Sequence, residues 1–296
     1  MVKEVGNLAP SAAAPSAVGG IALVVLSASA FGAMAIFARF AYAGGANVTG
    51  VLAARFTIAG LILAALMLAT QRPWPRGRAL AVAIGMGAIG YAGQAALFFA
   101  ALNHASAGLV ALLLYAYPTL VVLLSAAFLG ERLTAAKITL LAASFAGLAL
   151  TLGGGQGTAT GIALGLAAAA VYSVYIVIGA RELKDTDALA STTVICLSAA
   201  AVLALSALFT EPRFPGAWWG WAAIGAIAVV STVVSILAFV AGLKRVGPAT
   251  ASIVSTLEPV VTVALAWLVL GETLSLLQLA GGALVLACAA FLARAS

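Results

Sequence analysis

Ten long apolar runs are the feature that most limits how this chain can fold. Each holds about twenty residues, the length that crosses the roughly 30 Å hydrocarbon core of a bilayer. Runs of this length exclude the strands of a membrane barrel, so the backbone must satisfy its own hydrogen bonds as helices. The predicted helices, called spans 1 to 10, cover residues 20–42, 47–70, 79–102, 106–129, 134–152, 161–180, 188–209, 217–242, 248–270 and 275–293.

The composition also indicates a membrane protein. Hydrophobic residues make up 65% of the 296 residues and charged residues 7%, whereas a soluble domain carries roughly 25% charged residues. The net charge of +6 comes from basic residues scattered between apolar runs. This pattern predicts contact with the lipid bilayer and no nucleic-acid partner. Residues 1–17, rich in Ala, Pro and Ser, are expected to form a disordered cytoplasmic tail.

The distribution of Lys and Arg predicts the orientation in the membrane. If the N-terminus is cytoplasmic, the opposite side holds only Arg39 and Arg213, while Arg55 lies inside span 2. The positive-inside rule then favours both termini in the cytoplasm of a multi-pass protein of the inner (plasma) membrane. The eleven basic residues on the cytoplasmic side are Lys3, Arg72, Arg76, Arg78, Arg132, Lys137, Arg181, Lys184, Lys244, Arg245 and Arg294.

An internal repeat divides the chain into halves. Pro118 in span 4 recurs as Pro259 in span 9, at an offset of 141 residues. The Leu-Gly-Glu-Arg-Leu sequence at 129–133 recurs at the same offset as Leu-Gly-Glu-Thr-Leu at 270–274. Such matches are informative because Pro and Glu are scarce in or beside the spans. We interpret the two prolines as hinges of spans 4 and 9.

The repeat predicts the fold class. Residues 18–155 form a first repeat of five spans and residues 156–296 a second. Because five is odd, the second repeat must insert upside down relative to the first. We therefore expect an all-α membrane protein whose ten transmembrane helices form two inverted five-helix repeats around a central cavity. This arrangement is typical of secondary transporters, which bind substrate near the bilayer midplane.

These features resemble a known family. Ten spans in two halves, each with Pro in its fourth helix followed by a Leu-Gly-Glu-x-Leu end, are similar to the EamA-type branch of the drug/metabolite transporter superfamily. The resemblance covers nearly the whole chain, and it is greatest to amino-acid exporters of the YddG type. It implies that spans 4 and 9 line the cavity and that Gly130-Glu131 and Gly271-Glu272 sit at helix ends. It also implies export of small metabolites.

Span 9 carries the main candidate for a substrate contact. Glu258 lies near the bilayer centre, directly before Pro259, and shares a helix face with Ser252 and Ser255. Ionisable residues at this depth are functional candidates, although Glu258 could instead pair with another helix for structural reasons. Pro259 also leaves the Ser255 carbonyl without its helical donor, so that carbonyl could bind substrate or water.

Arg55 in span 2 has two alternative interpretations. It could reach the outer interface along its flexible stem, or it could face the cavity and contact an anion. Together with Glu258 it would suit a zwitterion. The other predicted substrate-binding residues are aromatic or weakly polar, which suits an amino acid with an apolar side chain; they are Tyr91, Gln94, Phe98, Tyr117, Tyr172, Tyr175, Ser231, Ser235 and Phe239.

The predicted function is that of a secondary transporter, not an enzyme, and it requires no cofactor. It would export small metabolites, most notably neutral and aromatic amino acids, by alternating access, either facilitated or coupled to protons. A transporter that exports lipophilic cations is the alternative interpretation. A channel lacks a recognisable selectivity filter. An intramembrane enzyme lacks clustered catalytic or metal-binding residues, because the chain has one His and two distant Cys.

Overall fold

The computed structural model describes residues 17–130, 133–153 and 157–295, and all structural statements refer to these residues. The predicted tail lies outside them except for Ala17, and so does Glu131 of the first helix-end motif. The elements in chain order are α1 (Ala17–Gly32), α2 (Met34–Ala43), α3 (Val48–Ala69), α4 (Gly77–Gly85), η1 (Met86–Tyr91), α5 (Ala92–Ala101), α6 (Ala107–Leu114), α7 (Tyr117–Leu129), α8 (Ala135–Gly153), α9 (Ala159–Glu182), α10 (Ala188–Ser206), α11 (Trp218–Ala228), η2 (Val229–Val234), α12 (Ser235–Ser255), α13 (Leu257–Leu270) and α14 (Leu276–Ala295).

These elements combine into ten helices that are long and apolar enough to cross a bilayer, as predicted. The largest shift in a boundary is at the end of span 8, which reaches Gly247 instead of residue 242. Gly247 has φ 77°, a left-handed conformation that favours glycine, and there the helical path breaks. The ten spans are Val18–Ala43, Val48–Ala69, Gly77–Ala101, Ala107–Phe128, Ala135–Gly153, Ala159–Glu182, Ala188–Ser206, Trp218–Gly247, Thr250–Leu270 and Leu276–Arg294.

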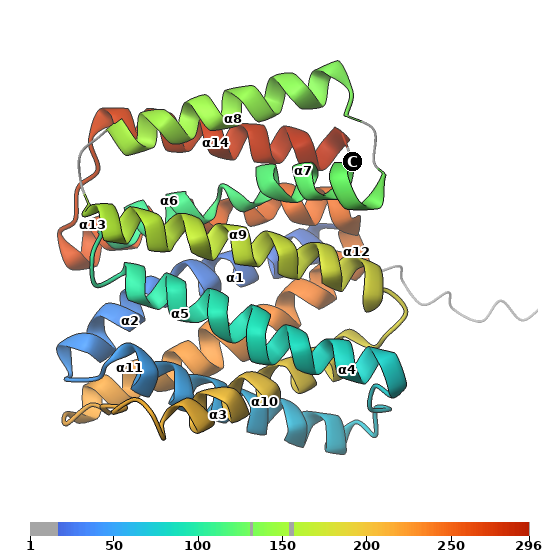
Figure 1. The fold of residues 1–296 in the computed structure, drawn as a ribbon, viewed down its shortest axis with the longest axis vertical. Helices are drawn as coiled ribbons and strands as arrows, with labels where there is room; N and C mark the ends of the chain where they lie inside the picture. The colour runs from blue at the N-terminus through green and yellow to red at the C-terminus, as the bar shows by residue number, and fades with distance from the viewer. Residues whose placement is uncertain (1–16, 131–132, 154–156, 296) are drawn as a thin grey trace, which may run out of the picture.

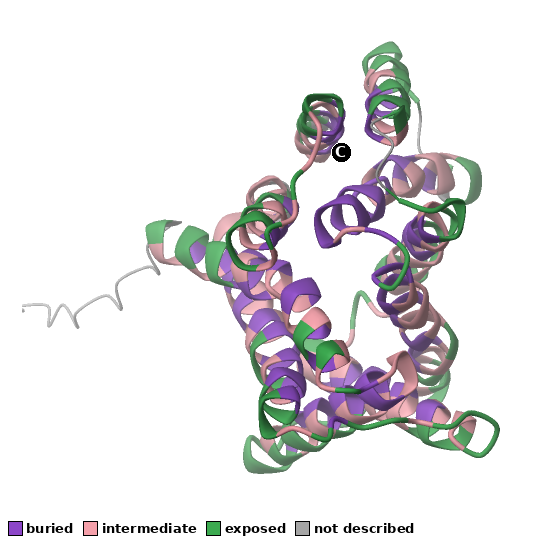
Figure 2. Cartoon of the chain, turned by 90° about the vertical axis from the view of Figure 1, so that its left-hand side faces the viewer, coloured by how far each residue is buried: buried purple, intermediate pink, exposed green. Residues whose placement is uncertain are grey.

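The two repeats are packed against each other along their length. α1 lies against α12, α3 against α10, α5 against α9, and α8 against α14, so each pair takes one helix from each half (Figure 1). The α8–α14 pair forms one edge of the molecule, beyond α6, α7 and α13 (Figures 1 and 2). Small residues permit this approach: a Cβ added to Gly281 of α14 would meet the Gly147 carbonyl of α8.

Five spans depart from a continuous α-helix. Span 1 is interrupted at Ala33, between α1 and α2, and the other four depart at positions that match between the repeats. Spans 3 and 8 contain the π-helical segments η1 and η2. Spans 4 and 9 are interrupted just before Pro118 and Pro259, where α6 ends at Leu114 and α12 at Ser255. π-turns and proline breaks expose backbone groups and reorient side chains. η1 and both proline breaks supply residues to the cavity described below, whereas no residue of η2 lines it.

The two ends of the bundle are tied differently. At the end named here the Glu272 end, Arg39 Nη2 donates to Glu272 Oε1 at 3.2 Å and to the Ala105 carbonyl at 3.0 Å. The second Glu272 oxygen accepts from the Ala107 N–H at 2.7 Å, at the start of α6. At the opposite end, named the Asp187 end, Arg72 Nη1 donates to Asp187 at 2.7 Å. The Glu272 contacts therefore join spans 1, 4 and 9 at one end of the cavity.

Candidate functional site

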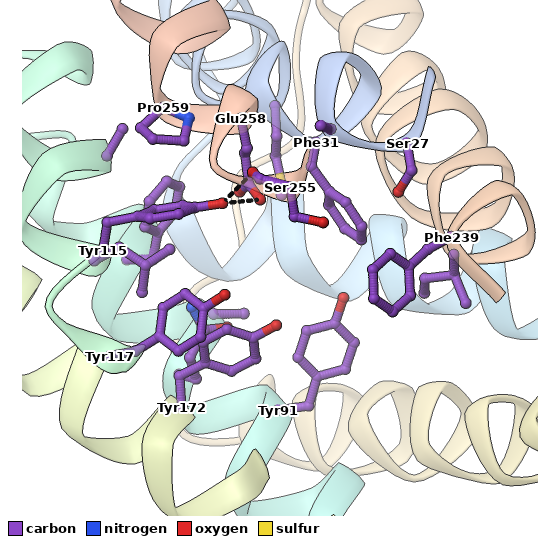
Figure 3. A pocket seen from close by; sticks show the side chains of 18 of the residues that line it. Ser27, Phe31, Tyr91, Tyr115, Tyr117, Tyr172, Phe239, Ser255, Glu258 and Pro259 are labelled. Atoms are coloured by element: carbon purple, nitrogen blue, oxygen red, sulfur yellow. Dashed lines mark hydrogen bonds between the residues drawn. The ribbon is translucent and has the colours of Figure 1, made fainter. Parts of the chain in front are cut away.

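The structure contains a cavity of about 320 Å³ between the repeats (Figure 3). Its wall includes α1, α2 and α3, the π-segment η1, and the broken spans 4 and 9. Of the thirteen predicted substrate-binding residues, eleven lie on this wall: Arg55, Tyr91, Gln94, Phe98, Tyr117, Tyr172, Tyr175, Phe239, Ser252, Ser255 and Glu258. Of the two predicted hinges, Pro259 lines the cavity, whereas Pro118 does not.

Arg55 lies inside the bundle and does not extend to the interface, being only 2% exposed. Its Nε donates to Thr232 Oγ1 at 3.0 Å and its Nη2 to Tyr91 Oη at 3.0 Å. The rings of Phe56, Tyr91 and Phe99 lie 4.8 to 5.6 Å from its guanidinium carbon, within the range of cation–π attraction. Among the described residues no carboxylate forms an ion pair with Arg55. A buried cation without an anionic partner is therefore present in the cavity wall.

Glu258 begins the second segment of span 9 and faces the same cavity. Tyr115 lies across from it, with its hydroxyl 3.3 Å from Glu258 Oε2 and 2.5 Å from the Ser255 carbonyl oxygen (Figure 3). The carbonyl that Pro259 leaves without a helical donor is thus paired with Tyr115 and is not open to substrate in this state. Within the described chain no basic side chain forms an ion pair with Glu258.

Five tyrosines connect the two charged groups along one wall. Neighbouring ring centroids are 4.8 to 6.0 Å apart along this series. Edge-to-face and stacked pairs at such distances are favourable, so the rings form a continuous aromatic surface. Tyr115 at one end contacts Glu258, and Tyr91 at the other end accepts a hydrogen bond from Arg55. The series runs Tyr115, Tyr117, Tyr172, Tyr175 and Tyr91.

Two predicted residues of span 8 do not line the cavity. Ser231 donates to the Ala30 carbonyl at 2.6 Å and Ser235 to the Thr232 carbonyl at 3.2 Å, and both are fully buried in helix contacts. The spacing of Ser231, Ser235 and Phe239 suits one face of an α-helix, but η2 widens the turn that contains Ser231 and shifts Ser231 from the face of Phe239. Only Phe239 of the three reaches the cavity.

Several lining residues were absent from the sequence prediction. Tyr115 is the most consequential, because it contacts both Glu258 and Ser255. Its place just before the proline break of span 4 is a signal that sequence inspection could have used. Where a helix is broken, its side chains can reach the neighbouring helix. Others that line the cavity without such a signal include Ser27, Phe99 and Thr192.

Asp187, which lies outside the spans, forms an ion pair that has a structural role. Burial opposes ionisation of Asp187, but hydrogen bonds from the Ala190 N–H and from Arg72 outweigh it and lower the pKa of the Asp187 carboxyl. This carboxylate also caps the start of α10. In the described part of the chain, no three His, Cys, Asp or Glu side chains gather so that they could hold a metal ion.

Known proteins share this organisation. The chain matches the EamA-like transporter family over residues 18–153 and again over 159–294. It is 33% identical to a probable terminal-alkyne amino-acid exporter of Streptantibioticus cattleyicolor over 82% of this chain and 83% of the relative. It is 30% identical to the aromatic amino acid exporter YddG of Ancylobacter novellus, over 79% of this chain and 81% of the relative.

A solved crystal structure is also similar to this fold. The TM-score is 0.66 at 25% sequence identity, over 95% of this chain and 99% of the other. The family match falls on each five-span half separately, as the internal repeat predicts. This chain of two inverted repeats belongs to the EamA-like transporter family.

Proposed function

We propose that the protein is a secondary transporter that exports neutral amino acids, including aromatic ones, by alternating access. Its substrate site is the cavity between Arg55 and Glu258. Both termini face the cytoplasm, and the host membrane is the plasma membrane. The names of two relatives, each an amino-acid exporter, support the substrate class.

The buried guanidinium of Arg55 carries this proposal. A charge that is removed from water and left without a counter-ion is costly, and Arg55 retains only two neutral hydroxyl partners. A substrate carboxylate would supply the missing anion. Because guanidinium–carboxylate hydrogen bonds are strong and directional, this group would also orient the substrate.

The remaining wall suits the rest of an amino acid. Glu258 and the tyrosine hydroxyls provide acceptors for an ammonium group, and the aromatic faces provide apolar contact with a side chain. Few charges line the cavity, so strongly charged side chains would be poorly accommodated. The proposal therefore favours neutral substrates over acidic or basic ones.

The main test is transport by purified protein in liposomes. Labelled phenylalanine and leucine should accumulate in exchange for internal unlabelled amino acid, because a carrier shows saturable counterflow and a channel does not. Uptake with and without a pH gradient distinguishes proton-coupled from facilitated transport. Uptake of a lipophilic cation with no amino-acid counterflow would favour the alternative drug-efflux function.

Arg55→Gln tests the carboxylate contact. Hydrogen bonds to charged groups contribute about 1.5–3 kcal/mol, which corresponds to a loss of affinity of roughly 10- to 150-fold. Arg213→Gln is the matched control, since it removes a positive charge from an exposed residue at the Glu272 end. Equal amino-acid affinity in Arg55→Gln and the parent would contradict the proposed site.

A further inference from the structure

The hydroxyl group of Tyr115 contacts both the Ser255 carbonyl and the Glu258 carboxyl of span 9. Tyr115 Oη is 2.5 Å from the Ser255 carbonyl oxygen and 3.3 Å from Glu258 Oε2 (Figure 3). Tyr115 is itself 2% exposed. Because Pro259 has no N–H, the Ser255 carbonyl lacks its helical donor. Its pairing with Tyr115 therefore ties the break in span 9 to the break in span 4.

The phenol has only one proton to donate. The shorter contact assigns that proton to the Ser255 carbonyl. The remaining contact is then a hydrogen bond only if Glu258 is protonated and donates its own O–H to Tyr115 Oη. If Glu258 is ionised, both oxygens near Tyr115 are acceptors, and they compete for one proton.

We propose that Tyr115 is a positioning residue that couples the proton on Glu258 to the bend of span 9 at Pro259. With Glu258 protonated, a relay runs from Glu258 to Tyr115 to the Ser255 carbonyl and holds the bend. When Glu258 releases its proton to solvent, the Tyr115 proton turns to the carboxylate and the Ser255 carbonyl loses its partner. Tyr115 keeps its proton throughout, so one proton is released and none is transferred along the relay.

The surroundings of Glu258 leave this role to Tyr115. The other titratable groups that face it are Tyr117, Tyr172 and Tyr91, and among the described residues none of these three donates a hydrogen bond to its carboxyl. The cavity's basic residue, Arg55, is bonded to Thr232 and Tyr91. From α1, the cavity receives only uncharged side chains.

The coupling exists in one repeat only. The position related to Tyr115 by the 141-residue offset is Thr256, whose hydroxyl donates to the Ile253 carbonyl of its own segment at 2.6 Å. The position related to Glu258 is Tyr117. The first repeat therefore supplies the hydroxyl and the second supplies the carboxyl and the released carbonyl, which gives the transporter a single proton-sensitive hinge.

The experiment measures the bend of span 9 directly. Spin labels at Val254 and Val269, on either side of Pro259, report its two segments in nanodiscs as pH is varied. We expect two distances in the parent protein, with the fraction of each set by pH. Glu258→Gln should hold the low-pH distance, because its amide can donate to Tyr115 as a protonated carboxyl does. Tyr115→Phe should hold the high-pH distance, because the Ser255 carbonyl then has no donor at any pH.

Tyr42→Phe is the matched control. Tyr42 also donates a hydroxyl hydrogen bond to a helix carbonyl, that of Phe99 at 2.8 Å, but it does not line the cavity. This variant should lose a comparable bond and retain the pH-dependent distances. A parent-like pH response in Tyr115→Phe, or a pH-independent distance in the parent, would overturn the proposed coupling.

The coupling rests on the proposed transport function, but the two can fail separately. The same proteins are assayed for amino-acid counterflow as a function of pH. If counterflow is absent while the distances follow the expected pattern, the transport proposal fails and the hinge coupling stands. If counterflow occurs and Tyr115→Phe keeps both its pH profile and its distances, the coupling fails and the transport proposal stands.

Discussion

Replacing Glu272 by Gln should open the Glu272 end of the cavity. In the structure one carboxylate oxygen accepts from Arg39 and the other from the Ala107 N–H, at 3.2 and 2.7 Å. A Gln side chain of the same shape has one acceptor oxygen, so it can keep one of these bonds but not both. The variant therefore weakens the hydrogen-bonded link between the segment that follows span 9 and the start of span 4.

The expected size of this effect follows from how far the Arg39 and Glu272 side chains are exposed. The Arg39 and Glu272 side chains are 31% and 18% exposed, so their ion pair contributes little, within about 0.2–1 kcal/mol. The N–H bond at a helix start is charge-assisted and contributes more, about 1.5–3 kcal/mol, of which a Gln oxygen keeps a part. A net loss of about 1–2 kcal/mol shifts an open–closed equilibrium roughly 5- to 30-fold.

The assay is the reaction rate of a cysteine in the cavity. Ala111→Cys lies on the cavity wall, one turn inside α6 from Ala107. In a background without Cys196 and Cys288, an impermeant thiol reagent applied at the Glu272 end should react 5- to 30-fold faster when Glu272→Gln is present. Asp187→Asn is the control, because it breaks an ion pair at the opposite end. An unchanged rate in a folded Glu272→Gln protein would refute the reasoning.

Three further predictions concern stability and topology. Gly281→Val should lower the thermal stability by about 1–3 kcal/mol, because its side chain would collide with the Gly147 carbonyl in the α8–α14 pair; unfolding in detergent measures it. Because the pKa of Asp187 is lowered in the fold, its stabilising effect is present at neutral pH and is lost as pH falls through that lowered value; Asp187→Asn should flatten this part of the stability–pH curve. Cysteines at Arg76 and Asn103 should react with an impermeant reagent from opposite sides of the membrane, and labelling from one side would contradict the proposed topology.

Most of the fold was predictable because membrane spans are encoded locally. A run of apolar residues of sufficient length must be a helix in lipid, and the structure confirms all ten. The repeat was equally visible, since Pro118 and Pro259 mark it directly. The end of span 8 was missed because Lys244 and Arg245 resemble a loop in sequence, whereas the helix continues past them to Gly247.

The details of the cavity were harder to predict from the sequence because they depend on departures from regular helix geometry. Helical periodicity placed Ser231 and Ser235 on the face of Phe239. Around η2, however, Ser231 donates to the Ala30 carbonyl of α1, and Ser235 donates back to the Thr232 carbonyl of its own span. Periodicity likewise could not decide whether Arg55 reaches the interface. Its inward position depends on Thr232, which η2 presents from the other repeat.

The same irregular segments explain why the two repeats can share a fold and differ at the site. A proline break in each repeat leaves a helix carbonyl to be paired from outside its own helix, and the pairing group need not be conserved by symmetry. Tyr115 fills this need for Ser255. At the Glu272 end the asymmetry recurs, because the position related to Ala107 is Pro248, which has no N–H to offer a carboxylate. Duplication thus supplies two similar hinges, and unequal hydrogen-bonding partners give each end of the cavity its own energetic cost of opening.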